Sequence, residues 1–354
     1  MRIIHVVGAR PNFMKVAPVV RALREYTSVR QSVVHTGQHY DFNMSDVFFQ
    51  ELGIGAPDIN LQVGSGSHAQ QTAEIMKRFE PVVLEHKPDL VLVYGDVNST
   101  VAAALVCAKL LVVVGHVEAG LRSFDRTMPE EVNRLVTDQL CGILFTPSQD
   151  ADFNLAREGV PPERIHLVGN VMIDTLIRML PAAEARIQQD LPRQFALVTL
   201  HRPGNVDDVE WLANMLRTLA EFSGELPVLF PVHPRTRERI GKTNLNGELA
   251  HLRLLEPLPY LEFLALQTRA TVVITDSGGI QEETTYLGKQ CLTVRENTER
   301  PITVEMGTNT LVGRDVGRLK TELSRILCHE KKASRIPPLW DGRAAERIAR
   351  ILSN

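Results

Sequence analysis

Three acidic side chains in the first half of the chain have the types and positions needed for proton transfer. Asp96 follows the apolar run 90–94, Glu118 lies after the next apolar run, and Glu130 opens a predicted helix. Parallel strands end at one edge of a sheet, so we expect the three carboxylates to lie together. Crowding of like charges raises the pKa of carboxyl groups, so this spacing predicts an acid–base centre.

Each of these acids also has a structural interpretation. Asp96 could cap the following helix, and Glu130 could complement a helix dipole while pairing with Arg134 four residues on. Glu118 lies between two glycines at the end of a strand, which is harder to explain by packing alone.

Basic side chains flank the turn after the first predicted strand. Gly8 permits a sharp turn, Pro11 suits the first helical position, and Arg10 and Lys15 stand on either side of the helix start. A helix N-terminus beside two cations favours an anion or a developing negative charge. The alternative is an ordinary helix entry with two solvated cations.

The second half of the chain carries residues suited to a phosphate group. His201 and His233 each follow a predicted strand, and the segment Ser277-Gly278-Gly279 leads from a strand into a helix. Backbone N–H groups at such a helix start bind phosphate well. Glu283, one turn further on, could reach ribose hydroxyls, and Arg300 could add a cation. The structural alternatives are histidines with satisfied hydrogen bonds and an ordinary capped turn.

Length and composition exclude several classes of protein. A chain of 354 residues exceeds one ordinary core, and 44% hydrophobic with 23% charged residues is typical of globular proteins. The net charge of −3 gives no general attraction to nucleic acid or to an anionic membrane. Scattered cysteines, a start without a leader pattern and no apolar run of about 18 residues predict a cytoplasmic protein without a membrane segment.

A nicotinamide cofactor and a metal ion are both disfavoured. Residues 64–69 fit the Gly-x-Gly-x-x-Ala dinucleotide pattern. That pattern belongs at the turn after the first strand, which here is the cationic turn at residues 8–15, so a Gly/Ser loop is the better interpretation. The eleven histidines show no His-x-x-His or His-Glu-x-x-His spacing. We therefore expect no cofactor.

Short β-branched runs alternate with helical patterns along the whole chain, which is typical of parallel βαβ units. The predicted strands are 3–7, 32–36, 90–94, 111–114, 142–146 and 165–168, then 196–200, 228–231, 253–255, 272–275 and 291–294. Two series of comparable length predict an α/β fold with two Rossmann-like, doubly wound parallel-sheet domains facing a cleft. We expect a hinge near Gly169 and Asn170, an N-terminal domain at 1–168, a C-terminal domain at 169–338 and a final helix within 339–354.

These segments together resemble the non-hydrolysing UDP-N-acetylglucosamine 2-epimerase family, whose members have two Rossmann-type domains of the GT-B-like kind. The matching strings, in order along the chain, are Gly8-x-Arg10-Pro11, Lys15, Gly95-Asp96, residues 116–122, residues 129–134, Thr199-x-His201-Arg202, Pro231-Val232-His233 and residues 276–283. The resemblance extends from residue 3 to about residue 313. It implies a final helix that returns to the first domain, a homodimer and a UDP-sugar substrate.

The resemblance also implies a reaction and a role for each matching residue. The C2 proton of the sugar has no adjacent carbonyl and is not acidic, so the family eliminates UDP to a 2-acetamidoglucal and adds it back after protonation on the other face. The implied acid–base residues are Asp96, Glu118 and Glu130, with Lys15 near the sugar. The implied substrate-binding residues are Arg10, His201, Ser277, Gly278 and Gly279 for the diphosphate, Glu283 for ribose, and His233 and Arg300 at the cleft.

The chain departs from the family pattern at several positions. Many members have Thr and Glu where this chain has Ala9 and Asn12, and Arg and Glu where it has Pro203 and Gly204. Residues 38–41 and 70–72 match only part of the lining of the second, activating substrate site known in bacterial members.

Four other functions stay open at this point. Two are close: a hydrolysing relative that releases UDP and N-acetylmannosamine, and a 2-epimerase for a modified sugar such as a diacetamido uronic acid. A GT-B glycosyltransferase with an acceptor groove is less favoured, because three carboxylates exceed what an acceptor base needs. The fourth is a nucleotide-sugar sensor without turnover.

Overall fold

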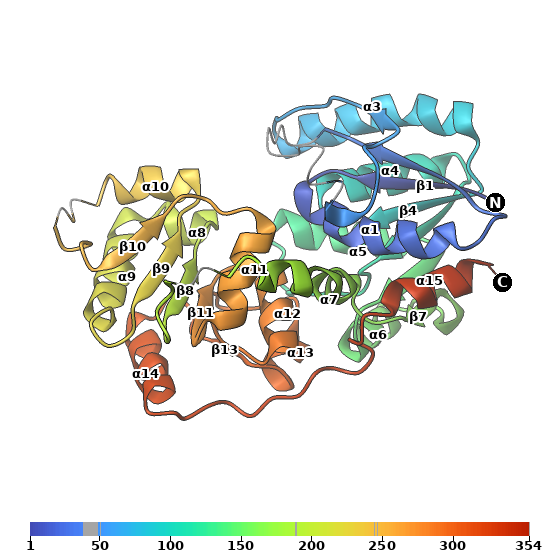
Figure 1. The fold of residues 1–354 in the computed structure, drawn as a ribbon. Coiled ribbons are helices and arrows are strands. Elements are labelled where there is room, and N and C mark those ends of the chain that lie inside the picture. Colours follow the sequence, from blue (N-terminus) through green and yellow to red (C-terminus); the bar gives the residue numbers. More distant parts are fainter. Residues whose placement is uncertain (38–48, 50, 188–189, 244, 246, 354) are drawn as a thin grey trace. The chain divides into compact units, whose positions relative to one another are not determined.

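The structure is a computed structural model that describes residues 1–37, 49, 51–187, 190–243, 245 and 247–353. The chain divides into two compact units (Figure 1). The first unit comprises Met1–Thr175 and Pro338–Asn354, and the second comprises Leu176–Pro337. Within the described residues, no helix combines the length and the apolar character needed to cross a membrane.

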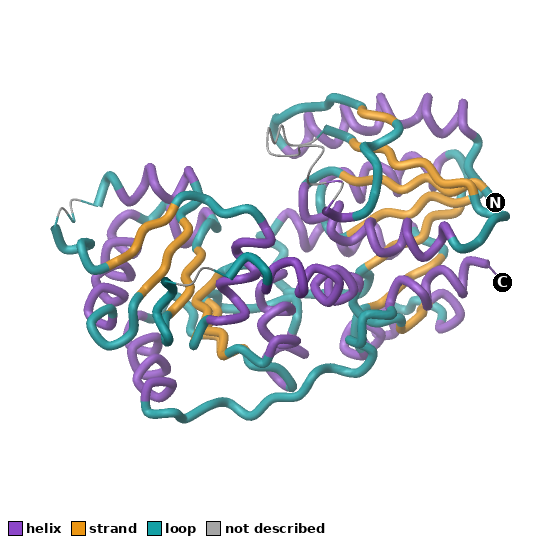
Figure 2. Tube along the Cα trace, viewed as in Figure 1, coloured by secondary structure: helices purple, strands orange, loops and turns teal. Residues whose placement is uncertain are grey.

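The first unit is built on a seven-stranded sheet in the order β3-β2-β1-β4-β5-β6-β7, and every neighbouring pair is parallel. Its strands are β1 (Arg2–Val7), β2 (Arg30–His35), β3 (Ile59–Asn60), β4 (Leu90–Tyr94), β5 (Val113–Val117), β6 (Ile143–Thr146) and β7 (Ile165–Leu167). Its helices are α1 (Arg10–Arg24), α3 (His68–His86), α4 (Asn98–Lys109), α5 (Pro129–Leu140), α6 (Gln149–Arg157), the short η1 (Pro162–Arg164) and α15 (Ala344–Ser353). Helices cover both faces of this sheet (Figure 2), so a central strand such as β4 is buried along its whole length.

The second unit repeats this plan with six strands in the order β10-β9-β8-β11-β12-β13, again all parallel. Its strands are β8 (Ala196–Thr199), β9 (Val228–Pro231), β10 (Leu252–Leu255), β11 (Val272–Thr275), β12 (Gln290–Thr293) and β13 (Asn309–Leu311). Its helices are α8 (Pro203–Val206), α9 (Val209–Phe222), α10 (Pro234–Ile240), α11 (Tyr260–Arg269), α12 (Gly278–Leu287), α13 (Pro301–Glu305) and α14 (Val316–Leu327). Helix α7 (Val171–Glu184) carries the chain from the first unit into the second. The predicted α/β fold with two parallel sheets is confirmed.

The strand order of each sheet reverses direction at a pair of adjacent strands. In the first unit β1 lies beside β4, and in the second β8 lies beside β11. Ligands of doubly wound sheets bind outside the carboxyl ends of the strands at such switch points. The loops that follow these four strands begin at Gly8, Gly95, Leu200 and Asp276. These loops contain cations, carboxylates, a histidine and glycines that the sequence predicts as site residues.

Three details of the predicted elements are corrected by the structure. The strand predicted at 111–114 is β5 at Val113–Val117, because Leu111 has a φ of 57° and is 92% exposed in the preceding turn. The short edge strands β3 and β13 were not predicted. Two or three residues of an edge strand give no alternation to detect.

The end of the chain belongs to the first unit. Helix α15 packs against α1, and the carboxylate of Asp174 accepts the backbone N–H groups of Ala344 at 3.1 Å and Ala345 at 2.7 Å. This contact caps the helix start, where N–H groups otherwise lack partners. The indole N–H of Trp340 donates to the carbonyl of Pro147 at 2.9 Å. The last residues are therefore held by specific hydrogen bonds as well as by packing.

The Gly-x-Gly-x-x-Ala segment at residues 64–69 leads into α3, which begins at His68, and does not follow β1 in the chain. The Oγ of Ser67 accepts the N–H of Gln70 at 3.3 Å, and the side chain of Gln70 accepts the N–H of Ser67 at the same distance. This reciprocal pair is a capping box. Helix capping therefore accounts for the pattern without a dinucleotide.

Candidate active site

Lys15 and Glu118 form a buried ion pair in the first unit. Lys15 extends from the first turns of α1, and its Nζ lies 2.5 Å from Oε2 of Glu118 after β5. A Cβ atom at position 95 would lie 2.6 Å from the same Nζ, so Gly95 leaves the room that the lysine occupies. Glu118 has a φ of 75°, which is uncommon for a residue other than glycine. Such backbone strain is typical of functional sites where the surroundings fix the conformation.

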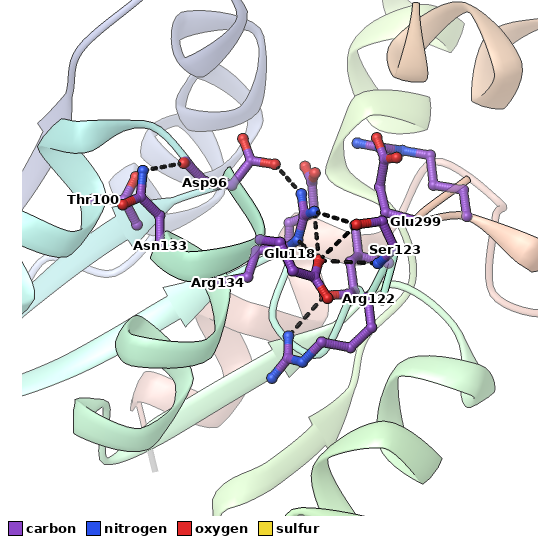
Figure 3. A network of polar contacts seen from close by, with 12 residues as sticks. Asp96, Thr100, Glu118, Arg122, Ser123, Asn133, Arg134 and Glu299 are labelled. Atoms are coloured by element: carbon purple, nitrogen blue, oxygen red, sulfur yellow. Dashed lines mark hydrogen bonds and ion pairs between the residues drawn. The ribbon is translucent and has the colours of Figure 1, made fainter. Parts of the chain in front are cut away.

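Asp96 is held by a buried arginine. Arg134 of α5 places Nη1 2.5 Å from Oδ2 of Asp96 (Figure 3). Its Nη2 lies 2.6 Å from Oε2 of Glu131. Asp96 keeps 25% of its side chain exposed, whereas Arg134 and Glu131 keep 2% each. Arg134 therefore binds Asp96 through Nη1, while Glu131 binds Nη2 and holds the guanidinium in place.

Glu131 has a structural role that the sequence interpretation missed. It accepts the N–H of Ser123 at 2.9 Å and the N–H of Phe124 at 3.0 Å, besides its ion pair with Arg134. Burial alone would raise the pKa of Glu131, but the hydrogen bonds from Ser123 and Arg134 outweigh burial and hold it below the ordinary value. The i,i+3 spacing of Glu131 and Arg134 is the sequence feature that could have predicted this ion pair.

The neighbouring acid, Glu130, lies half-buried in the first turn of α5. Arg134, which the sequence offers as its surface partner, is instead buried between Asp96 and Glu131.

Asn12 joins the two loops on either side of the switch point. Its Oδ1 accepts the N–H groups of Gly8 at 3.2 Å and Ala9 at 3.0 Å, and its Nδ2 donates to the carbonyl of Tyr94 at 2.9 Å. An amide can donate and accept at once, whereas an ionised glutamate only accepts. The departure from the family pattern at Asn12 thus ties the loop that begins α1 to the end of β4. Arg10, at the first position of that helix, is half-buried.

In the second unit, Asp276 organises the loop that carries His201. Its carboxylate lies 3.1 Å from Nδ1 of His201 and accepts the backbone N–H of Arg202 at 2.9 Å and Nδ2 of Asn205 at 3.0 Å. Burial would raise the pKa of Asp276, but the hydrogen bond and charge of His201 and the other donors hold it below the ordinary value. The His201 side chain is 44% exposed while its Nδ1 faces the carboxylate. Asp276 lies in the matching segment 276–283, but the sequence did not predict it as a site residue.

The Ser-Gly-Gly turn begins α12 directly after β11. Ser277 is the N-cap residue and Gly278 and Gly279 form the first turn. A Cβ atom at Gly278 would lie 2.6 Å from Nη1 of Arg300 and 2.8 Å from Oε1 of Glu299. Only glycine fits there, because the guanidinium of Arg300 packs under the turn.

The charge of Arg300 is balanced by carboxylates. Its Nε lies 2.7 Å from Oε1 of Glu282, and its Nη1 pairs with Glu299. Glu299 also binds Nη2 of Arg295 at 2.6 Å. Burial would raise the pKa of Glu299, but the positive charges of Arg300 and Arg295 hold it far below the ordinary value. Arg300 therefore supports the turn as a neutralised group.

Two further predicted residues have contrasting surroundings. Glu283 is 4% exposed and accepts the phenolic hydroxyl of Tyr260 at 2.9 Å. Burial raises the pKa of Glu283 from 4.5 to about 7. His233 is exposed at the start of α10, where its Nδ1 accepts the N–H of Arg235 at 3.3 Å. This hydrogen bond caps the start of α10.

The structure thus forms two sets of site residues. In the first unit Lys15, Glu118, Asp96 and Arg134 occupy the loops at the switch point and the face of α5. In the second unit His201, Asp276 and the Ser-Gly-Gly turn with Arg300 beneath it occupy the equivalent edge. Residues 38–41, which the sequence relates to a second substrate site, lie outside the described residues.

Two parallel sheets, with cation-bound carboxylates at the switch point of one and a Ser-Gly-Gly helix start at the switch point of the other, define a GT-B-like α/β protein. The model of the UDP-N-acetylglucosamine 2-epimerase family matches residues 21–353. This chain belongs to that family, and the resemblance seen in its motifs is confirmed.

Three comparisons give the extent of the similarity. The UDP-N-acetylglucosamine 2-epimerase of Methanocaldococcus jannaschii is 42% identical over 365 residues, covering 100% of this chain and 99% of the relative. The crystal structure of the Methanocaldococcus jannaschii UDP-GlcNAc 2-epimerase in complex with UDP-GlcNAc and UDP has a TM-score of 0.91 at 41% identity, covering 100% of this chain and 99% of that one. The UDP-2,3-diacetamido-2,3-dideoxy-D-glucuronate 2-epimerase of Pseudomonas aeruginosa is 41% identical over 360 residues, covering 100% of this chain and 99% of the relative.

The raised pKa of Glu283 predicts a pH-dependent stability. An acid whose pKa rises from 4.5 to about 7 on folding contributes stability that is complete below 4.5 and is lost as the pH rises through 7. Between pH 5 and pH 8 the wild-type protein should lose on the order of 2 kcal/mol more unfolding free energy than Glu283→Gln, measured by urea denaturation. Glu305→Gln, which changes an exposed acid, should respond to pH like the wild type. Parallel curves for the wild type and Glu283→Gln would contradict this prediction.

Proposed function

We propose that this protein reversibly epimerises UDP-N-acetylglucosamine at C2 to give UDP-N-acetylmannosamine, without hydrolysing the product. The observation that carries the proposal is the pair of cation-bound carboxylates, Glu118 with Lys15 and Asp96 with Arg134, at one switch point. The relatives named for this activity cover the whole chain at about 40% identity, which adds support.

The proposed reaction is elimination followed by re-addition. A carboxylate removes the C2 proton, the C1–O bond breaks, and UDP leaves with the bonding electrons to give a 2-acetamidoglucal. UDP then adds back at C1 while a proton is delivered to the opposite face of C2. This route suits the site because it needs an ionised base and acid–base groups close to the sugar.

The first unit would supply the acid–base groups. We propose that Asp96, Glu118 and Glu130 form this set, with Lys15 close to the reacting sugar. A buried carboxylate beside a cation stays ionised and can accept a proton. The two ion pairs would therefore keep two potential bases ready near one another.

Most of the groups that hold the leaving group would come from the second unit, with Arg10 from the first. We propose that the N–H groups at the start of α12, the ring of His201 and the guanidinium of Arg10 bind the diphosphate, and that Glu283 binds ribose. Donors aimed at a developing negative charge stabilise the transition state more than the ground state. His233 and Arg300 would line the same site, Arg300 by supporting the Ser-Gly-Gly turn.

We further propose that residues 1–168 form the acid–base domain, that residues 169–338 form the UDP-binding domain, and that the helix within 339–354 completes the first. A homodimer in the cytoplasm is proposed with them.

A modified UDP-sugar is the second candidate substrate. The Pseudomonas aeruginosa relative that is named for a diacetamido uronate is as similar to this chain as the archaeal relatives. Its reaction would use the same carboxylates and differ only in the substituents at C3 and C5 of the sugar.

Product analysis tests the proposed reaction directly. The purified protein is incubated with UDP-N-acetylglucosamine, and separately with the diacetamido uronate, and products are identified by proton NMR. UDP-N-acetylmannosamine with intact UDP linkage is the expected product. Free N-acetylmannosamine with UDP would identify a hydrolysing enzyme, and epimerisation of the uronate alone would identify the second candidate. No product from either sugar would contradict the proposal.

Removing the charge of Asp96 should stop turnover. Asp96→Asn should lower kcat by at least about 10²-fold while UDP affinity stays within a few-fold, because general acid–base groups contribute about 10²–10⁴-fold. Asp89→Asn is the matched control, since Asp89 precedes the same strand β4 at its opposite end. Turnover by Asp96→Asn at the wild-type rate would remove Asp96 from the reaction.

Replacing His201 should weaken the binding of UDP itself. His201→Ala removes a hydrogen bond to a charged diphosphate, which is worth roughly 1.5–3 kcal/mol, so the Kd for UDP should rise at least tenfold by calorimetry. His251→Ala, at an exposed histidine of the same unit, serves as the control. An unchanged Kd in His201→Ala would exclude His201 from the phosphate site.

A further inference from the structure

A further buried cluster of polar side chains lies beside the candidate carboxylates of the first unit. His116, near the end of β5, is fully buried with its Nδ1 2.6 Å from Oδ1 of Asp138 and its Nε2 2.8 Å from the carbonyl oxygen of Gly95. A carbonyl oxygen can only accept, so Nε2 carries a proton. The other ring nitrogen, Nδ1, faces the carboxylate of Asp138, so the ring connects the loop after β4 to helix α5.

Asp138 is held in its ionised form by its other contacts. This residue of α5 is fully buried, and its Oδ2 lies 2.7 Å from Nη2 of Arg122 and accepts the N–H of Gly120 at 3.1 Å. Burial would raise the pKa of Asp138, but the charges and hydrogen bonds of His116 and Arg122 outweigh it and hold the pKa below the ordinary value. The nearby Arg122 is shared with Glu158 at 2.7 Å. The group is therefore a charged network inside the protein.

The contacts of Asp138 hold the chain in place on both sides of Glu118. His116 lies two positions before Glu118, and Gly120 lies two positions after it. Glu118 has a φ of 75° and Gly120 a φ of 80°, and a Cβ at Gly120 would lie 2.5 Å from the carbonyl oxygen of Ala151. A backbone in this unusual conformation persists only where the surroundings over-determine it.

The same histidine also reaches the loop of the other carboxylate. Its Nε2–H group donates to the carbonyl of Gly95, the residue before Asp96. The backbone N–H of Gly95 donates in turn to the carbonyl of Val117, the residue before Glu118. One buried histidine thus connects the loops that carry Asp96 and Glu118.

We propose that His116 and Asp138 are positioning residues of the epimerisation. They hold the backbones of Glu118 and Asp96 at fixed positions relative to each other and do not contact the sugar. This inference rests on the proposed function, since it assigns a role within the same site. It extends the set of functional residues from the carboxylates to the buried pair behind them.

Another buried histidine of the same sheet provides a matched control. His5 on β1 is also fully buried, but its Nδ1 lies 2.6 Å from the hydroxyl of Tyr94 and its Nε2 2.9 Å from Oε1 of Gln31. A phenol and an amide can satisfy a neutral ring, and burial lowers the pKa of His5 to about 4. His5 and His116 are therefore equally buried but differ in their hydrogen-bond partners, and neither of these partners of the His5 ring lies in the loops of Asp96 and Glu118.

Kinetics of three variants test the positioning role. Asp138→Asn and His116→Gln should lower kcat by about 10²-fold, the loss that a misplaced reacting group causes. The KM and the Kd for UDP should change less than threefold, because the diphosphate residues of the second unit are untouched. His5→Gln should keep kcat within threefold of the wild type. Unchanged kcat in Asp138→Asn and His116→Gln, or an equal loss in His5→Gln, would overturn the proposal.

Histidine NMR of the unaltered protein provides a test that does not depend on the stability of any variant. With ¹⁵N-labelled histidine, a buried ring should carry a proton on Nε2 that is protected from exchange with solvent, and this signal should be absent from His116→Gln. The ring of His5 should show a single protonated nitrogen. An Nε2 of His116 that carries no proton, or one that exchanges freely, would overturn the bond to Gly95 whether or not the protein is an epimerase, whereas failure of the proposed function would be seen as lack of product from the wild type.

Discussion

Burying a carboxylate without a partner costs several kcal/mol, so an acid inside a protein needs a cation or a full set of donors. The first unit satisfies this requirement three times around one switch point. Lys15 neutralises Glu118, Arg134 neutralises Asp96, and Arg122 neutralises Asp138, which also contacts His116. Because each cation comes from a different element than its acid, these ion pairs also fix how β4, β5, α1 and α5 meet. The positions of the candidate catalytic groups thus follow from the need to compensate buried charge.

The carboxylates buried in the second unit are also compensated by donors and cations, but there they support the loop of His201 and the Ser-Gly-Gly turn. Asp276 is compensated by donors that hold the His201 loop, and Glu282 and Glu299 balance Arg300 beneath Gly278. The ionised acids of this unit therefore support the Ser-Gly-Gly turn. Glu283 differs, because Tyr260 supplies a hydroxyl and no charge, and burial raises its pKa to about 7. A carboxyl group of this kind can change protonation when a ligand binds.

The sequence was sufficient for the fold and for the loops of the site. Alternating strands and helices predicted two parallel sheets, and the rule that parallel strands end at one edge placed Gly8, Asp96 and Glu118 near one another. The partners of these acids were not predictable. Glu131, Arg134 and Asp138 lie on α5, and which of its side chains face the sheet depends on how the helix packs. The pairing of His116 with Asp138 spans 22 positions and has no local pattern.

For two segments, the structure gives an explanation that differs from the one suggested by the sequence pattern. Asn12 looked like a departure from the family pattern, yet its amide joins the turn after β1 to the end of β4. The Gly-x-Gly-x-x-Ala segment resembled a dinucleotide site, yet Ser67 and Gln70 form a capping box there. In both cases the side chain's capacity to donate and accept explains its position better than the pattern does.

The central claim is that carboxylates held by buried cations move a proton at C2 of the sugar. The most direct measurement is proton NMR of UDP-N-acetylglucosamine with the protein in D₂O. The account predicts that the C2 hydrogen is replaced by deuterium in the epimerised product and, with time, in the recovered substrate. Epimerised product that keeps its original hydrogen at C2 would contradict the account, because that hydrogen would then not have exchanged through a carboxylate.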